Sequence, residues 1–120
     1  MRRITSEDAL PILKEMEMLS VKGRIVGGVE RRGYSFKDID IKVETSNAEE
    51  TTRILKNGLK SKYPFCVDIF VGEEFSVFYQ PWREKWLVCR QKEMDMLKDF
   101  VYSIPLIRNL MPHYHKPDFL

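Results

Sequence analysis

The segment 38–43 alternates between polar and apolar residues, and this pattern constrains the fold more than any other feature of the chain. It reads Asp-Ile-Asp-Ile-Lys-Val. Side chains along a strand point alternately to its two faces, so the pattern predicts a half-buried strand with the two isoleucines and the valine facing a core. Asp38 and Asp40 then share the other face, about 6 to 7 Å apart along the strand.

A second apolar run, Phe65 to Val71, also predicts a strand, opened by Pro64. Asp68 interrupts this run, and a carboxylate without partners is costly to bury in such a setting. Because both segments carry carboxylates on one face, we expect them to be neighbours in one mixed sheet. The sequence therefore predicts a cluster of Asp38, Asp40 and Asp68 on one sheet face, with helices on the other face.

Glycines lie close to this cluster in the sequence. Gly27-Gly28 precede Asp38 by nine intervening residues, at the end of a short strand predicted over Arg24–Val29. Since glycine has no Cβ, the two backbone N–H groups can approach a polyphosphate closely, although Gly-Gly is by itself more often just a turn. Arg31 and Arg32 follow in the same connection and could bind phosphate oxygens or simply be solvated.

Two helices are predicted in the first half of the chain. Residues 6 to 19 carry an apolar stripe at three- and four-residue steps, with Pro11 expected in or near the first turn. Ser46 and Glu49 form a capping-box pattern that predicts the start of the second helix. Its expected inner stripe consists of Thr51, Ile54, Leu55, Gly58 and Leu59.

The second half is less regular. Residues 75–79 alternate and predict a strand after a turn at 72–74. We expect a C-terminal helical segment over about 90–111, ended or kinked near Pro105, and an irregular tail. Trp82 and Trp86 could stack a base or meet a partner, but packing within a helix or hairpin is the commoner role for such a pair.

The resulting order of helices and strands predicts an α+β or α/β fold, a small mixed β-sheet flanked by helices, in a single domain over residues 1–120. Apolar residues make up 43% of the chain and charged residues 32%, which argues against disorder. The net charge of +2 is too small to indicate a nucleic-acid partner, although it does not exclude one.

We expect a soluble, cytoplasmic protein with reduced thiols. Cys66 and Cys89 are not paired by any disulfide spacing. Glu7 and Asp8 stand where a signal peptide would have its apolar run, and no window approaches the roughly 20 apolar residues of a membrane span.

The three carboxylates indicate a site for divalent cations. Neighbouring carboxylates repel one another, and Mg²⁺, or Mn²⁺ in its place, relieves that repulsion by binding their oxygens. Asp68 allows a second ion, and two ions can serve the attacking and leaving oxygens of a phosphoryl-type displacement. We therefore expect two Mg²⁺ ions and a nucleoside triphosphate (NTP) substrate.

Taken together, an apolar residue before Gly27-Gly28, nine residues, Asp38-x-Asp40 and a third Asp68 resemble the DNA polymerase β superfamily of nucleotidyltransferases. The resemblance covers about residues 24–71, and the Arg-Arg-Gly after the glycine pair is similar to that of the family X DNA polymerases. It implies a palm-like fold and transfer of a nucleoside monophosphate from an NTP to a hydroxyl, with release of pyrophosphate.

The resemblance also implies the roles of individual residues. Gly27 and Gly28 would bind the triphosphate, Asp38 and Asp40 would hold both metals, and Asp68 would hold the catalytic metal and help to activate the hydroxyl. Gly28 departs from the serine that many members carry there, which removes one hydroxyl contact. A weaker similarity, a strand followed by a helix leading out of the palm, covers 75–90.

At 120 residues the chain has no room for the template-binding domains of a polymerase. The resemblance is therefore to the minimal nucleotidyltransferases, which often act with a helical partner protein and some of which are antitoxins that adenylylate a toxin. A partner or a second copy (a homodimer) would complete so small a site. The alternative is a non-catalytic or antitoxin-type subunit of the same fold. The acceptor and the preferred NTP stay open.

Overall fold

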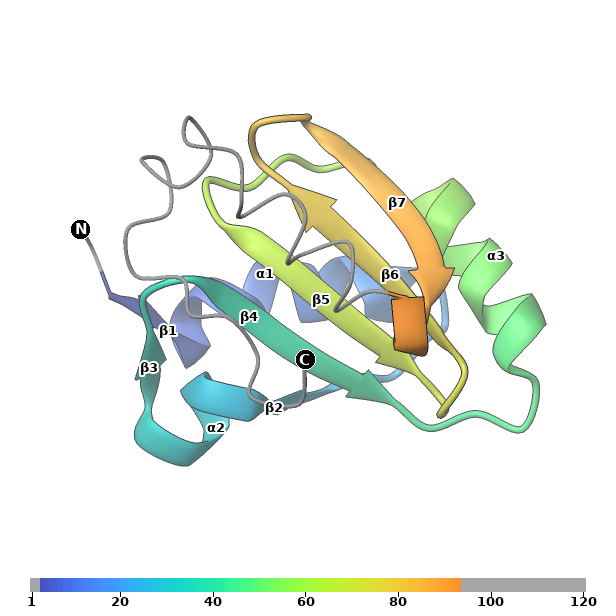
Figure 1. Cartoon of the computed structure of the whole chain (residues 1–120), viewed down its shortest axis with the longest axis horizontal. Coiled ribbons are helices and arrows are strands. Elements are labelled where there is room, and N and C mark those ends of the chain that lie inside the picture. Colours follow the sequence, from blue (N-terminus) through green and yellow to red (C-terminus); the bar gives the residue numbers. More distant parts are fainter. Residues whose placement is uncertain (1–2, 94–120) are drawn as a thin grey trace.

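A mixed five-stranded sheet forms the centre of the molecule (Figure 1), and the computed structural model describes residues 3–93. The strand order is β2-β4-β5-β6-β7; β4 and β5 are parallel, and the other neighbours are antiparallel. The predicted α+β class and the mixed sheet are confirmed. The strands are β2 Arg24–Val26, β4 Asp38–Val43, β5 Cys66–Val71, β6 Phe75–Gln80 and β7 Lys85–Arg90.

The apolar residues of β4 face the core, as its alternating pattern predicted. Ile39 and Ile41 are fully buried and lie beside Val67 and Ile69 of β5, which are also fully buried. Both strands therefore contribute an apolar face to one core. The carboxylates of the two strands are left on the other face, because successive side chains of a strand alternate between faces.

Helix α1, Ser6–Met18, lies behind the sheet in the view of Figure 1 and presents a buried face to the core. Met16 is fully buried and Met18 is 80% exposed, because two positions two residues apart on a helix cannot face the same way. Pro11 lies inside the helix rather than in or near its first turn. The start is set by Thr5, whose backbone N–H donates to Asp8 Oδ2 at 2.8 Å.

The glycine pair begins a helix and does not end a longer strand. Strand β2 stops at Val26, and helix α2 runs over Gly27–Arg32, so the predicted strand over Arg24–Val29 is too long. The cause is local: Gly27 has φ +71°, a left-handed conformation that turns the chain out of the sheet. Val29 is then buried from the helix rather than from a strand.

After α2 the chain forms β3, Tyr34–Ser35, which pairs antiparallel with β1, Ile4–Thr5, in a separate two-stranded sheet. Neither short strand was predicted. Two residues each are too few for a periodic pattern to be recognised.

Helix α3 runs over Ala48–Gly58 and contacts β5, β6 and β7. Asn47 is its N-cap and accepts the backbone N–H of Glu50 at 3.1 Å, so the cap predicted at Ser46 is one residue early. The inner face includes Thr52, and Ile54 is 36% exposed, which corrects the predicted stripe. The helix packs at the edge of the sheet through its 52–55–59 side.

Strands β6 and β7 form a hairpin, which corrects two predictions. Arg90 ends a strand and does not start a helix, and segment 75–90 is strand–turn–strand rather than strand–helix. A helical turn at 91–93 follows; the rest of the segment predicted over 90–111, and the tail, lie outside the described residues. Trp86 is buried within the hairpin, as expected for the packing role. It packs on Tyr79 with ring centroids 5.2 Å apart and donates Nε1–H to Ser61 O.

Glu15 of α1 anchors the connection between α3 and β5. Its carboxylate accepts the backbone N–H groups of Lys60 and Ser61 at 3.1 and 3.3 Å, and the hydroxyl of Tyr63 at 3.0 Å. This connection leads into β5, so the contacts help to fix where Asp68 lies.

Candidate metal centre

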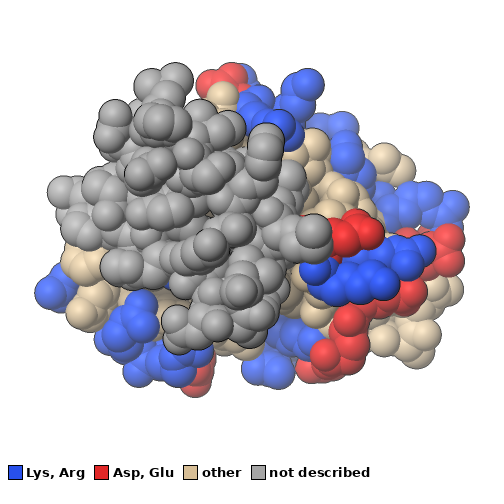
Figure 2. Space-filling view, in the orientation of Figure 1, with Lys and Arg blue, Asp and Glu red and all other residues tan. Residues whose placement is uncertain are grey.

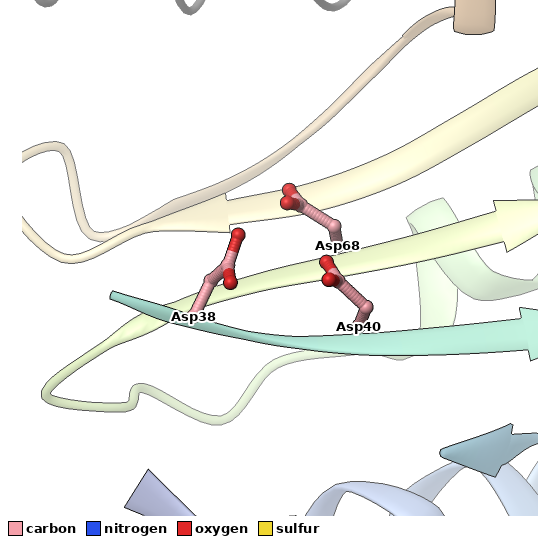
Figure 3. Close-up of side chains that lie close together, drawn as sticks. All are labelled: Asp38, Asp40 and Asp68. Carbon is pink, nitrogen blue, oxygen red and sulfur yellow. The ribbon is translucent and has the colours of Figure 1, made fainter. Parts of the chain in front are cut away.

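Three aspartates from β4 and β5 meet on one face of the sheet (Figure 3). Asp40 and Asp68 are direct partners across the parallel pair, and Asp38 lies two residues before Asp40. One carboxylate oxygen from each lies within 4.8 Å of the others. The parallel register produces this cluster, since a shift of one residue in β5 would turn Asp68 into the core.

Two of the three aspartates are buried. Asp68 is 1% exposed and Asp38 is 8% exposed, while Asp40 is partly exposed. Two ionised carboxylates about 4 Å apart repel by about 4 kcal/mol at an effective dielectric constant of 20. Carboxylate oxygens are the ligands of hard divalent cations, so the trio could hold a metal ion.

Lys42 shares the trio's face of β4 but is directed toward the other end of the strand. Its ammonium donates to the carbonyl of Gly72 and lies 3.1 Å from Glu73 Oε1. Its charge therefore pairs with Glu73 in the turn between β5 and β6 rather than with the aspartates.

Gly27 lies directly against the trio. A Cβ at this position would overlap Asp40 Oδ2 and lie 3.0 Å from Asp40 Cγ. The space that a side chain would fill is thus occupied by the carboxylate itself. Glycine is required here twice, once for this contact and once for the φ of +71°.

Gly28 has a different neighbour. A Cβ there would lie 2.5 Å from Nη2 of Arg32, so the guanidinium of Arg32 folds back along α2 onto this glycine. Arg31 is exposed in the same last turn. The structure therefore places Gly27 against Asp40 and Arg32 against Gly28, and Arg31 is exposed nearby in the same helix.

Ser35 holds the start of β4 and was missed by the sequence analysis. Its Oγ accepts the backbone N–H groups of Lys37 at 3.2 Å and Asp38 at 3.3 Å, and its side chain is buried. A serine three residues before Asp38 is the available signal, because serine often accepts N–H groups two or three residues on. Ser35 orients the first aspartate of the trio.

Comparison with known proteins adds no relative: no protein-family model, curated protein or solved structure matches the chain. Within residues 3–93, none of the helices is long and apolar enough to cross a membrane.

Proposed function

We propose that this protein is a metal-dependent nucleotidyltransferase that moves a nucleoside monophosphate from an NTP to a hydroxyl acceptor. The observation that carries the proposal is the convergence of Asp38, Asp40 and Asp68, with one oxygen of each within 4.8 Å of the others. A second observation joins the two halves of the motif, since Gly27 packs on the carboxylate of Asp40.

The donor set fits the cation that the proposal requires. Three carboxylates, two of them buried, supply oxygen ligands, and within residues 3–93 no histidine or thiol belongs to the cluster. Such a set suits Mg²⁺ or Mn²⁺ better than a thiolate-binding metal. When bound, two such ions would neutralise charge on the attacking and leaving oxygens.

The glycine pair with Arg32, and Asp68, would bind different parts of the reactants. The backbone of Gly27 and Gly28 and the guanidinium of Arg32 would hold the β- and γ-phosphates, which places the leaving group on the α2 side of Asp40. Asp68 lies one strand further from α2, so the acceptor hydroxyl would approach from its side. The acceptor oxygen bonds to the α-phosphorus, the bond to the bridging oxygen of the β-phosphate breaks, and pyrophosphate leaves. The hydroxyl proton passes to Asp68 or to water.

The test compares ATP binding and turnover in wild type and in variants of the trio. Calorimetry with ATP and Mg²⁺ measures binding, and pyrophosphate release in the presence of a cell lysate as acceptor source measures turnover. We expect Asp38→Asn and Asp68→Asn to abolish turnover. Glu44→Gln, which removes an exposed carboxylate just after β4, serves as the matched control and should keep it.

Unchanged turnover in either aspartate variant would contradict the proposal. If wild type bound no ATP with Mg²⁺, the non-catalytic or antitoxin-type subunit would become the better description of the chain. A partner protein or a homodimer remains part of both descriptions.

A further inference from the structure

Two arginines from different parts of the chain place their guanidinium groups over the ring of Tyr34. The guanidinium carbon of Arg3 is 4.3 Å from the centroid of the Tyr34 ring, and that of Arg32 is 5.7 Å from it. Both distances fall within the range of about 6 Å in which a cation is attracted to an aromatic ring. Phe36 packs edge-on against the same ring, with centroids 5.4 Å apart. The ring is therefore fixed on one side by an aromatic neighbour while it holds two cations.

The backbone builds this arrangement from three short elements. Helix α2 ends at Gly33, which has φ +86° and donates its N–H to Val29 O, and the chain then enters β3 with Tyr34. Thr5 of β1 is the partner of Tyr34 in the two-stranded sheet. That pairing brings Arg3, the residue before β1, close to Tyr34 at the end of α2.

Arg32 links this stack to the candidate metal centre. Its guanidinium carbon lies 5.7 Å from the centroid of the Tyr34 ring, and a Cβ at Gly28 would be 2.5 Å from its Nη2. Gly27, next in the chain, lies against Asp40. Stack, glycine pair and trio are therefore continuous. Lysine and arginine side chains gather at this end of the molecule, over α2 at the lower left of Figure 2.

We propose that Tyr34, supported by Arg3, is a positioning residue that holds the guanidinium of Arg32 beside Gly28 for the β- and γ-phosphates of the NTP; this rests on the proposed function. An exposed arginine has many rotamers, and ordering one of them on binding weakens affinity. Stacking on Tyr34 restricts those rotamers in advance. A guanidinium fork so placed can donate to two phosphate oxygens at once.

The placement predicts selectivity for the triphosphate over the monophosphate. Arg32 would address only the phosphates beyond the α-phosphorus, so AMP, which lacks them, would not use the stack. The stack should therefore affect the affinity for ATP and the KM for ATP, and leave AMP binding nearly unchanged.

The test is calorimetry of ATP and of AMP, each with Mg²⁺, on wild type, Tyr34→Leu and Tyr34→Phe. Tyr34→Leu removes the ring, and we expect ATP binding to weaken about tenfold with AMP binding unchanged. Tyr34→Phe keeps the ring and should bind ATP within about twofold of wild type. Arg3→Gln removes one cation from the stack and should weaken ATP binding by less than Tyr34→Leu does.

The outcomes separate this proposal from the proposed function. Equal ATP affinity in wild type and Tyr34→Leu, or equal losses for ATP and AMP, would overturn the positioning role alone. Absence of ATP binding in wild type would overturn the proposed function and the positioning role with it. Thermal melts of the three variants show whether Tyr34→Leu is folded. If it is not, the ATP affinities of Arg3→Gln and wild type are compared instead. An ATP affinity that Arg3→Gln leaves unchanged overturns the support assigned to Arg3.

Discussion

Replacing Gly27 by alanine tests how closely the glycine pair and the carboxylates are joined. Two costs combine at this position. The backbone has φ +71°, where an L-residue is disfavoured by about 1–2 kcal/mol. The new methyl group would also overlap Asp40 Oδ2 and crowd Asp40 Cγ at 3.0 Å, so the carboxylate would have to move out of the trio.

Gly33→Ala is the matched control. Gly33 has φ +86°, so the same backbone cost applies, but nothing lies within 4 Å of the position of its Cβ. We expect Gly33→Ala to lower the free energy of unfolding by about 1–2 kcal/mol. We expect Gly27→Ala to lower it by about 2–4 kcal/mol, because relieving an overlap in a packed site adds to the backbone cost.

Both effects are measurable by equilibrium urea unfolding, and by thermal melts at about 4 °C per kcal/mol for a chain of this size. Titration with Mn²⁺ adds a second readout. Gly27→Ala should weaken cation binding because Asp40 is displaced, whereas Gly33→Ala should leave it unchanged. Equal stability losses together with equal cation affinities would refute the packing of Gly27 on Asp40.

Three further predictions concern Tyr63, Thr52 and the binding of Mg²⁺. Burial, followed by the hydrogen bond to Glu15, raises the pKa of Tyr63 from 10.0 to about 12. The folded state thus favours the neutral phenol, and this stabilisation is complete below pH 10 and should be lost as the pH rises from about 10 to 12. The loss in the free energy of unfolding should be no more than about 2 kcal/mol after solvent screening. A Tyr63→Phe variant should lack this pH dependence in urea unfolding. Thr52 Oγ1 is buried without a hydrogen-bond partner within the described part of the chain, so Thr52→Val should be neutral or raise the melting temperature, and a clear loss would reveal a partner. Millimolar Mg²⁺ should raise the melting temperature of wild type but not of Asp38→Asn, because a ligand of the native state stabilises it by mass action.

The parts of the fold that the sequence predicts well are those with a strict period. The alternation in 38–43 and the apolar run around Asp68 led to two neighbouring strands, which β4 and β5 confirm. The apolar stripe predicted over residues 6 to 19 corresponds to helix α1, in which Met16 is buried and Met18 is exposed. In each case a long enough pattern reports burial directly, because burial of apolar side chains decides which face turns inward.

The errors occur where local conformation or tertiary contacts decide. Glycine permits a positive φ but does not require one, so the sequence does not reveal the turn at Gly27. The predicted strand was therefore extended past Val26. Strand β7 escaped prediction because its burial is confined mainly to Trp86, whose partners Tyr63 and Tyr79 come from other elements. The stack on Tyr34 depends on the β1–β3 pairing, which no spacing along the chain indicates.

In the candidate site too, the sequence predicts some features and only the fold shows the others. Three carboxylates on two strands were predictable from spacing, whereas their separation depends on the parallel register. Arg32 was singled out beside Arg31, and only the fold distinguishes the arginine that lies on Gly28 from the one that does not.

The proposed function requires that the α-phosphoryl group of an NTP, together with its nucleoside, is transferred to the acceptor. The most direct measurement incubates wild type and Asp68→Asn with a cell lysate and Mg²⁺, using ATP labelled either in the α- or in the γ-phosphate. We expect acceptor labelling from α-labelled ATP with wild type alone, and release of the γ-label as pyrophosphate. Labelling of the acceptor from γ-labelled ATP, or α-labelling that is equal with wild type and Asp68→Asn, would contradict it.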